Sequence, residues 1–440
     1  MINLNKSMAM QRRAKTRIPG MTQLLSKRPD LFSRGAWPGY FQKAQGAYVW
    51  DLDGNRYLDM SIGGIGATVL GYADPDIDKA VCAAIVKGVA CSLNCPEEVE
   101  LAELLCELHP WADQVRFSRC GGEAMAMAVR IARAQTGRSK IAFCGYHGWH
   151  DWYLAANLKE EGALDAHLIG GLEPRGVPRE LAGTAIPFRM NFLDEFTDAV
   201  AHCGNDLAAV VMEPLRNIQP DFDFIRAVRK TVDKLNAVLI IDEISAGLRY
   251  NTGGAHLVMH PVEPDIAVFS KALGNGYAIS AVVGRKSVMD AAQSTFISST
   301  NWTERIGPVA ALATLRKHAD LKVHRHLITL GESVQKGWSE AARRAGLPIE
   351  IGGMKPMSHF KIQVLEWPYV KAYFVQKMLE KNFLASDLFY SMYAHTRANV
   401  DLYIAAVEEV FEDIANILSN GNIKACVNNE PSIMGFERLN

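Results

Sequence analysis

The chain has 440 residues, of which 49% are hydrophobic and 22% are charged, so it is long enough for two lobes with buried cores and is neither disordered nor fibrous. Its formal net charge is −1, from 47 basic and 48 acidic side chains. Such a balance provides no global field toward nucleic acid or an anionic membrane, and we expect small-molecule partners. Eight cysteines without a CxxC pair argue against a zinc knuckle or a disulfide scaffold, and with no apolar run long enough to span a membrane they predict a cytoplasmic protein.

Residues 1–75 are expected to form an N-terminal arm and a hairpin that belong to a small domain. Seven Lys or Arg residues lie in the first 29, but no cleavage-like boundary follows them, which favours an arm over a targeting peptide. The segment 47–52 then predicts a strand that runs into the turn at Asp53-Gly54 and returns through 57–59.

Residues 76–308 are expected to form a large three-layer α/β/α domain. Helical patterns there alternate with short apolar runs at 114–118, 140–143, 207–212, 237–241 and 266–269. Runs without polar alternation are typical of strands in a mostly parallel sheet that helices cover on both faces.

Residues 309–440 are expected to form the rest of a smaller α+β domain. Their pattern is helical from 309 to the 340s, strand-like at 358–364 and helical again from about 400 to 418. Together with the N-terminal hairpin, this segment predicts a second domain built from both ends of the chain.

Polar residues follow several apolar runs where the ligands of an open α/β sheet usually gather, and one of them is Glu213, after the run 207–212. Lys271 comes after the run 266–269, where burial would lower its pKa and make the amine able to form a Schiff base, unless it extends to solvent as most lysines do. Asp242 ends the run 237–241 and needs a cation or strong donor, such as a protonated pyridine nitrogen. An N-cap is the other interpretation of Asp242. An ATPase acidic pair is excluded, because the chain has no Gly-Lys-Ser or Gly-Lys-Thr.

Two further clusters follow the first and second apolar runs. Gly121-Gly122 opens a predicted helix whose N-terminal amides are suited to a phosphate. His147, His150 and Asp151 lie among Tyr146, Trp149 and Trp152, which favours an aromatic stacking wall over a metal site, and we expect no metal.

Together, a Schiff-base lysine, an acid for a pyridinium, a phosphate cup and an aromatic platform meet the requirements of pyridoxal 5′-phosphate. Their order resembles the class III aminotransferases of fold type I, in the branch similar to glutamate-1-semialdehyde aminomutase. The likeness runs from Gly46 to Thr396, and its most specific motifs are Ile241-Asp242-Glu243-Ile244, Pro264-Asp265-Ile266 with Ser270-Lys271, and Tyr146-His147-Gly148.

The resemblance implies a role for each matching residue. Lys271 would hold the cofactor as an internal aldimine and shuttle the proton, while Asp242 would keep the ring nitrogen protonated. Thr300 would reach the phosphate of a neighbouring subunit, which implies a homodimer with shared sites. The other implied cofactor contacts are Gly121 and Gly122 on the phosphate, Ile244 and Tyr146 on the ring faces, and Glu213 and His147 beside the cofactor.

The chain departs from the family pattern at three places. Cys120-Gly121-Gly122 stands where Ser-Gly-Thr is usual, Asn301–Arg305 where Ser-Gly-Asn-Pro is common, and Ile62–Gly66 where the aminomutase has a tryptophan-containing segment. We therefore predict an aminotransferase that moves an amino group from an amino-acid donor to a small carbonyl acceptor, with an intramolecular aminomutase as the alternative. A ligand-binding protein on the same scaffold is a third hypothesis, which the presence of Lys271 disfavours. Candidate substrate-lining residues are Arg34, Asn217, Trp302 and Arg305.

Overall fold

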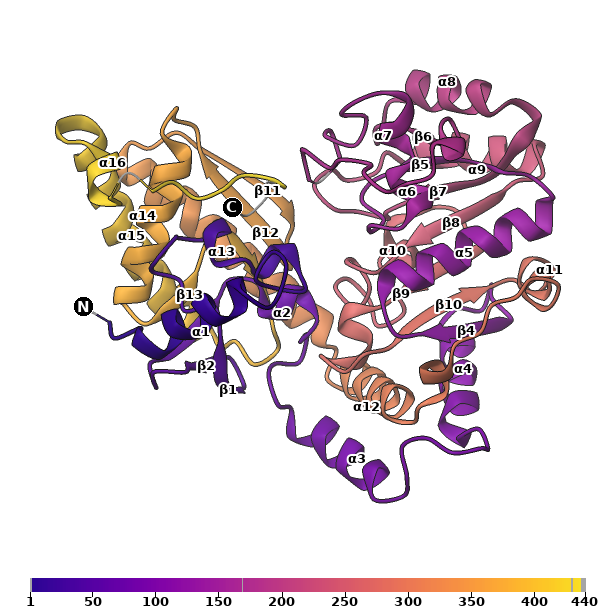
Figure 1. Ribbon diagram of the computed structural model, residues 1–440, viewed down its shortest axis with the longest axis horizontal. Coiled ribbons are helices and arrows are strands. Elements are labelled where there is room, and N and C mark those ends of the chain that lie inside the picture. The colour runs from indigo at the N-terminus through magenta and orange to yellow at the C-terminus, as the bar shows by residue number, and fades with distance from the viewer. Residues whose placement is uncertain (1, 168, 429, 437–440) are drawn as a thin grey trace. The chain divides into compact units, whose positions relative to one another are not determined.

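The computed structural model describes residues 2–167, 169–428 and 430–436. Its contacts divide the chain into two compact units, and Figure 1 labels their elements. Unit 1 comprises Met1–Asp74 and Arg325–Asn440, and unit 2 comprises Pro75–His324. The second limit that we predicted, 308/309, falls inside helix α12 (Ile306–Asp320), which packs on α3 (Pro75–Ile85) and α4 (Pro96–Leu108) of unit 2.

A seven-stranded sheet with the order β4-β10-β9-β8-β7-β5-β6 forms the centre of unit 2. Neighbouring strands from β9 to β6 are parallel, whereas β10 is antiparallel to both β9 and β4, so β4 runs in the same direction as the others. The sheet is therefore mostly parallel, as predicted. The strands are β4 (Gln114–Ser118), β5 (Lys140–Cys144), β6 (Ala185–Pro187), β7 (Leu207–Met212), β8 (Val238–Asp242), β9 (Ile266–Phe269) and β10 (Ser280–Gly284).

Helices cover both faces of this sheet. Helix α5 (Gly121–Thr136), which crosses the sheet in Figure 1, packs in one cluster with Ile240, whereas α8 (Leu193–Cys203) and α9 (Phe222–Lys234) pack in another with Ile241. Because successive strand residues point to opposite faces, these two clusters are the two sides of a three-layer α/β/α fold. The shorter helices of unit 2 are α6 (Asp151–Leu154), α7 (Ala156–Lys159), α10 (His256–Met259) and α11 (Lys286–Met289).

Both ends of the chain build unit 1, which confirms the smaller α+β domain. Its four-stranded sheet has the order β1-β2-β3-β13, in which β3 and β13 are parallel and Leu58 pairs with Phe383. A three-stranded sheet has the order β11-β12-β14. The strands are β1 (Phe41–Gln45), β2 (Tyr48–Asp51), β3 (Arg56–Met60), β11 (Ile349–Met354), β12 (Met357–Ile362), β13 (Phe383–Ala385) and β14 (Leu388–Tyr390).

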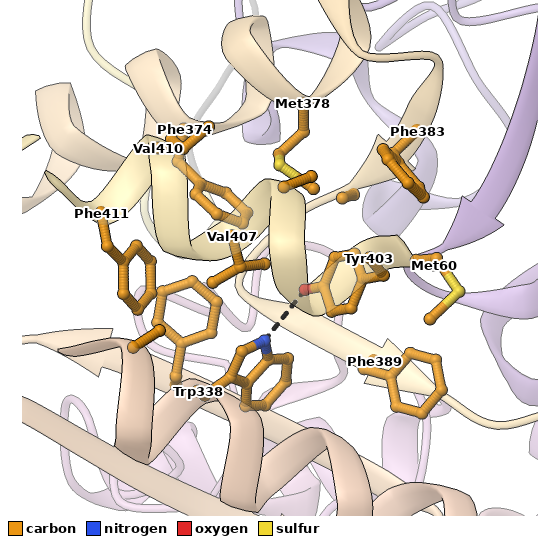
Figure 2. Close-up of a cluster of buried hydrophobic side chains, with 14 of the residues drawn as sticks. Met60, Trp338, Phe374, Met378, Phe383, Phe389, Tyr403, Val407, Val410 and Phe411 are labelled. Carbon is orange, nitrogen blue, oxygen red and sulfur yellow. Dashed lines mark hydrogen bonds between the residues drawn. The ribbon is translucent and has the colours of Figure 1, made fainter. Parts of the chain in front are cut away.

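Helices of unit 1 pack over these sheets around an aromatic core. The helices are α1 (Asn5–Lys15), α2 (Gly63–Gly66), α13 (Val323–Ala345), α14 (Trp367–Glu380), α15 (Arg397–Asn420) and α16 (Ile423–Cys426). Figure 2 shows Trp338, Phe374, Tyr403 and Phe411 side by side in this core, all of them buried. The indole Nε1–H of Trp338 donates a 3.0 Å hydrogen bond to the Tyr403 hydroxyl, which gives each polar atom a partner in an apolar setting. In the part of the chain that the structure describes, no helix combines the length and apolarity needed to cross a membrane.

Candidate active site

Polar side chains of unit 2 gather where β9, β8 and β7 end. Lys271 follows β9, Asp242 is the last residue of β8, and Glu213 follows β7. These strands are parallel neighbours in the sheet, so their carboxyl ends lie at one edge. The three residues that we predicted from separate strand ends are thus brought to the same place.

Lys271 has an unusual backbone conformation, and its surroundings lower the pKa of its amine. Its φ is +40°, in the left-handed region that costs free energy for any residue with a Cβ. The half-buried side chain places Nζ 2.6 Å from the hydroxyl Oγ of Ser245. Burial, followed by the positive charge of Arg216, lowers the pKa of the Lys271 amine from 10.5 to about 8. About one Lys271 amine in ten is therefore in the nucleophilic neutral form at pH 7.

Hydrogen-bond donors hold the buried carboxylate of Asp242. Its Oδ2 lies 2.7 Å from Nδ1 of His147, and its Oδ1 accepts from the backbone N–H of Ile244 at 3.0 Å. The second ring nitrogen of His147 lies 3.1 Å from the carbonyl oxygen of Cys144. These contacts at both oxygens fix the position and orientation of the Asp242 carboxylate.

Glu213 and Arg216 form an ion pair beside Lys271. Arg216 Nη2 lies 2.6 Å from Glu213 Oε1, and the backbone N–H of Tyr146 donates to Glu213 Oε2 at 3.2 Å. Burial acts to raise the pKa of Glu213, but the charge and hydrogen bonds of Arg216 hold it below its ordinary value. Gly145, at φ +111°, leaves room for this carboxylate, because a Cβ there would lie 2.6 Å from Glu213 Oε2.

Two glycines at the N-terminal end of α5 pack closely against neighbouring side chains. A Cβ on Gly121 would lie 2.9 Å from Cδ1 of Ile244, and one on Gly122 would lie 2.9 Å from Cδ2 of His150. The side chain of Glu123 accepts from the backbone N–H of Cys120 at 3.0 Å, which fixes the turn into the helix. Backbone amides at the start of this 16-residue helix can approach an anion closely, and the helix dipole favours negative charge there.

Tyr146 and Ile244 are both half-buried and pack against the same apolar cluster around α5. The Tyr146 ring makes an edge contact with Tyr153, with the centroids 5.8 Å apart, and burial raises the pKa of its hydroxyl. An aromatic and a branched aliphatic side chain at this edge can flank a planar ligand.

The remaining predicted residues are less closely connected to Lys271. Thr300 and Asn217 are exposed in unit 2, and Arg34 is exposed in unit 1. Trp302 is half-buried, and its carbonyl oxygen accepts from Nη2 of Arg119 at 2.9 Å. Arg305 makes an ion pair with Glu97 at 3.0 Å, so its guanidinium is already engaged.

Sequence reasoning did not identify Ser245, whose hydroxyl accepts from Lys271, or Arg216, which donates to the same hydroxyl. Arg216 lies three residues after Glu213, and ion pairs are common at this spacing. The sequence therefore contained a signal that could have identified Arg216. Ser245 carried no signal, because a serine three residues after a strand end has no distinctive pattern.

A mostly parallel three-layer sheet with a lysine, an acid and a glycine-lined helix end at one edge is the arrangement of a fold type I pyridoxal 5′-phosphate transferase. The family model described as aminotransferase class-III matches residues 33–362. The chain therefore belongs to the class III aminotransferases, and it is a pyridoxal 5′-phosphate-dependent enzyme of that family.

Relatives of this chain include transferases and mutases. It is 28% identical to the 3-aminobutyryl-CoA aminotransferase of Cloacimonas acidaminovorans over 95% of this chain and 99% of the relative. It is 30% identical to the glutamate-1-semialdehyde 2,1-aminomutase of Chloroflexus aggregans over 86% and 92%. A solved transaminase with PLP bound superposes with a TM-score of 0.84 at 25% identity, over 94% of this chain and 99% of that one.

The residues present fit this cofactor. Gly121 and Gly122 open the 16-residue helix α5, whose first backbone N–H groups suit a phosphate. The buried carboxylate of Asp242 can accept from a ring N–H, and the Lys271 amine is partly neutral near pH 8. Each part of the cofactor therefore has a chemically matched group on this chain.

Proposed function

We propose that this chain is an aminotransferase that moves an amino group from an amino-acid donor to a small carbonyl acceptor, with Lys271 as the residue that holds the cofactor. The observation that carries this proposal is the half-buried Lys271 amine, whose pKa is lowered to about 8, at the same sheet edge as the buried carboxylate of Asp242. A lysine in this state is suited to nucleophilic and acid–base work at neutral pH.

When bound, pyridoxal 5′-phosphate supplies the electron sink that makes a Cα proton of the donor removable. Lys271 would take up this proton at Nζ and give it back, and Asp242 would accept from the ring nitrogen and keep it protonated. The amides of Gly121 and Gly122 would donate to the phosphate. Tyr146 and Ile244 would flank the ring, and would exclude water from its faces.

Two remaining contacts at the cofactor belong to His147 and Glu213. His147 would hold Asp242 in place through the 2.7 Å contact with its carboxylate. Glu213 would stand at the edge of the cofactor with its charge balanced by Arg216.

We further propose a cytoplasmic homodimer in which Thr300 completes the phosphate site of the second subunit. Support comes from the exposure of Thr300 in η7 (Thr300–Thr303), where its hydroxyl is available to another chain. The eight cysteines, all free in the structure, suit a reducing compartment.

Substrate contacts are proposed for Arg34, Asn217, Trp302 and Arg305. Arginines are suited to a donor carboxylate, because the planar guanidinium binds it through two hydrogen bonds. Arg305 would need to exchange its partner Glu97 for substrate in order to serve.

An intramolecular aminomutase is the second candidate, because a glutamate-1-semialdehyde 2,1-aminomutase is among the relatives at 30% identity. The two functions differ in their need for a second substrate. The holoenzyme of a transferase changes its absorbance when an amino-acid donor is added alone, and it needs an oxo acid to return. Turnover of an amino aldehyde with neither donor nor oxo acid would reject the transferase in favour of the mutase.

The proposed role of Lys271 is tested by borohydride reduction of the purified holoenzyme and peptide mass mapping. We expect the cofactor to be fixed on the peptide that contains Lys271. Fixation on another lysine would contradict the proposed function.

A further inference from the structure

We propose that Arg119, paired with Glu304, is a positioning residue that holds in place the segment carrying Thr300. This inference rests on the proposed function, in which Thr300 completes the phosphate site of a second subunit, and it adds the side chain that fixes Thr300 for that task. Arg119, Thr300 and Glu304 all belong to unit 2. Sequence reasoning did not identify Arg119.

The guanidinium of Arg119 holds the backbone just after Thr300. Its Nη2 donates to the carbonyl oxygen of Trp302 at 2.9 Å and to that of Glu304 at 2.8 Å. A guanidinium nitrogen of this kind has two N–H groups in a fixed plane, so it can serve both carbonyls at once. The path of the chain from Trp302 to Glu304 is therefore set by one side chain.

A second arginine holds the backbone on the other side of Thr300. Arg116, in β4, donates from Nη2 to the carbonyl oxygen of Ile297 at 2.6 Å. Within the segment, the hydroxyl of Thr303 donates to the carbonyl oxygen of Thr300 at 3.0 Å. The side chain of Thr300 is exposed, although its backbone lies between these two anchors. A short span between anchors has few conformations, so little ordering would be needed when the hydroxyl meets a ligand.

The ion pair between Arg119 and Glu304 is largely shielded from water. Nε of Arg119 lies 2.9 Å from Oε1 of Glu304, and the two side chains are 11% and 21% exposed. Salt screens such a pair less than it screens a pair on the surface. Glu304 is also fixed, because its carboxylate accepts from the backbone N–H groups of Ile306 at 2.7 Å and Gly307 at 2.9 Å. The start of α12 therefore holds the acid that orients Arg119.

The backbone of Arg119 belongs to the turn that opens α5. Its N–H donates to Oε2 of Glu123 at 3.1 Å, and the N–H of Cys120 donates to the same oxygen at 3.0 Å. The two glycines that follow are those proposed to bind the phosphate in their own subunit. Arg119 therefore connects the start of α5 to the segment that would offer Thr300 to the other subunit.

The test is the affinity of the full-length chain for pyridoxal 5′-phosphate, measured by absorbance titration after the cofactor has been removed. We expect Thr300→Ala to weaken binding by about 10-fold, because a hydrogen bond to a charged group is lost. Arg119→Gln should weaken it by about 5-fold, since glutamine can neither pair with Glu304 as an ion nor serve both carbonyls. The double variant should bind no more weakly than Thr300→Ala alone, because Arg119 acts through Thr300.

This non-additivity separates positioning from a structural role. If Arg119 served only the scaffold, or if its loss disturbed the start of α5 directly, its effect would be independent of Thr300. The two losses would then multiply to about 50-fold in the double variant. That outcome overturns the inference.

Glu304→Gln tests the same contact from its other side. It removes the charge that pairs with Arg119 and keeps an acceptor for the first N–H groups of α12. We expect it to weaken cofactor binding, again without a further loss when it is combined with Thr300→Ala. An unchanged affinity in both folded Arg119→Gln and folded Glu304→Gln overturns the inference.

Arg138→Gln is the matched control. The half-buried guanidinium of Arg138 also donates to two backbone carbonyls, those of Leu207 at 3.1 Å and Leu235 at 2.6 Å. Leu207 is the first residue of β7, so this contact lies at the opposite end of the strand from Glu213. Its loss should leave the cofactor affinity unchanged.

The outcomes distinguish this inference from the function on which it rests. An unchanged affinity in Thr300→Ala defeats the proposed shared phosphate site, and the inference with it. Weaker binding in Thr300→Ala, together with an absent or a multiplying effect of Arg119→Gln, defeats the inference alone. If Arg119→Gln does not fold, Glu304→Gln decides by the same comparison with Thr300→Ala.

Discussion

The aromatic core of unit 1 and the strand-end edge of unit 2 differ in the side chains that they bury. The core in Figure 2 buries rings from three helices around one hydrogen bond, between Trp338 and Tyr403. The edge instead gathers a lysine, two carboxylates and an arginine that are buried or half-buried. Burial of apolar surface stabilises the first region, whereas desolvation of charge is a cost in the second. Substitutions in the aromatic core should therefore change the free energy of unfolding, and those at the strand-end edge should change catalytic activity.

The largest effect is expected for Lys271→Ala, which removes the group proposed to move the proton. We expect kcat to fall by at least about 10³-fold, because acid–base catalysis by one side chain contributes up to about 10⁴-fold and the covalent link is also lost. Thermal unfolding should change little. Rapid absorbance measurements of the half-reaction check this, with the exposed Lys234→Ala as control. Substantial turnover in the variant would reject the assignment.

Phe374→Ala tests the other side of the comparison. Phe374 is 1% exposed in the core, and removal of such a ring should lower the free energy of unfolding by about 3–5 kcal/mol. Activity per folded molecule should stay the same. Urea unfolding measures the loss, and Leu365→Ala, at a side chain 97% exposed, should change stability by less than about 0.5 kcal/mol. An active-site defect in folded Phe374→Ala would break the separation of roles.

Asp242→Asn removes one charge at nearly constant shape. We expect the rate to fall by about 10²-fold, because the ring nitrogen would lose the anion proposed to keep it protonated. The stability change should be smaller than for Phe374→Ala, since the amide oxygen can still accept from the N–H of Ile244. Steady-state kinetics measure the loss of rate, and urea unfolding of the same sample measures the loss of stability. The exposed Asp194→Asn is the control. Loss of stability without loss of rate would make Asp242 a structural residue.

The smallest effect concerns the cost of burying the Lys271 amine in the cofactor-free chain. The pKa of the Lys271 amine is about 8 in the folded chain and 10.5, its ordinary value, in the unfolded chain. Between these pH values the unfolded chain therefore binds a proton that the folded chain does not, and protonation disfavours folding. The cost is fully present below pH 8, decreases as pH rises through the window, and is absent above 10.5. Lys271→Met should therefore be more stable than wild type by about 1–2 kcal/mol at pH 7.

Urea unfolding at pH 7 and pH 10 measures this gain. It should shrink at the higher pH, as the cost to wild type disappears. A gain that is constant with pH would mean that the methionine simply packs better, and that the charge of Lys271 is not the cause.

Strand ends were the part of the site that sequence could predict. Apolar runs mark buried strands by their composition alone, so the positions of Lys271, Asp242 and Glu213 followed from local pattern. Strand β10 was not assigned, although it lies antiparallel between β4 and β9, because its insertion depends on pairing with segments distant in sequence. The Ser245 contact is equally non-local: Ser245 and Lys271 are brought together only when β8 and β9 pair.

The partners of charged side chains are a second feature that the sequence did not predict. Arg305 was expected to line the substrate pocket, and the structure pairs it with Glu97, far away in sequence. A long flexible side chain can meet several partners, and the choice depends on how whole helices pack. Composition and spacing contain no information on that choice.

The parallel pairing of β3 with β13 has a consequence for how this protein folds during its synthesis on the ribosome. Leu58 pairs with Phe383, and all of unit 2 lies between them in the chain. At roughly 5–20 residues per second, synthesis leaves the N-terminal sheet without this neighbour for on the order of 15–65 s. During that interval its open edge is a target for chaperones and for wrong pairing, whereas the contiguous unit 2 is fully synthesised before Phe383 is added.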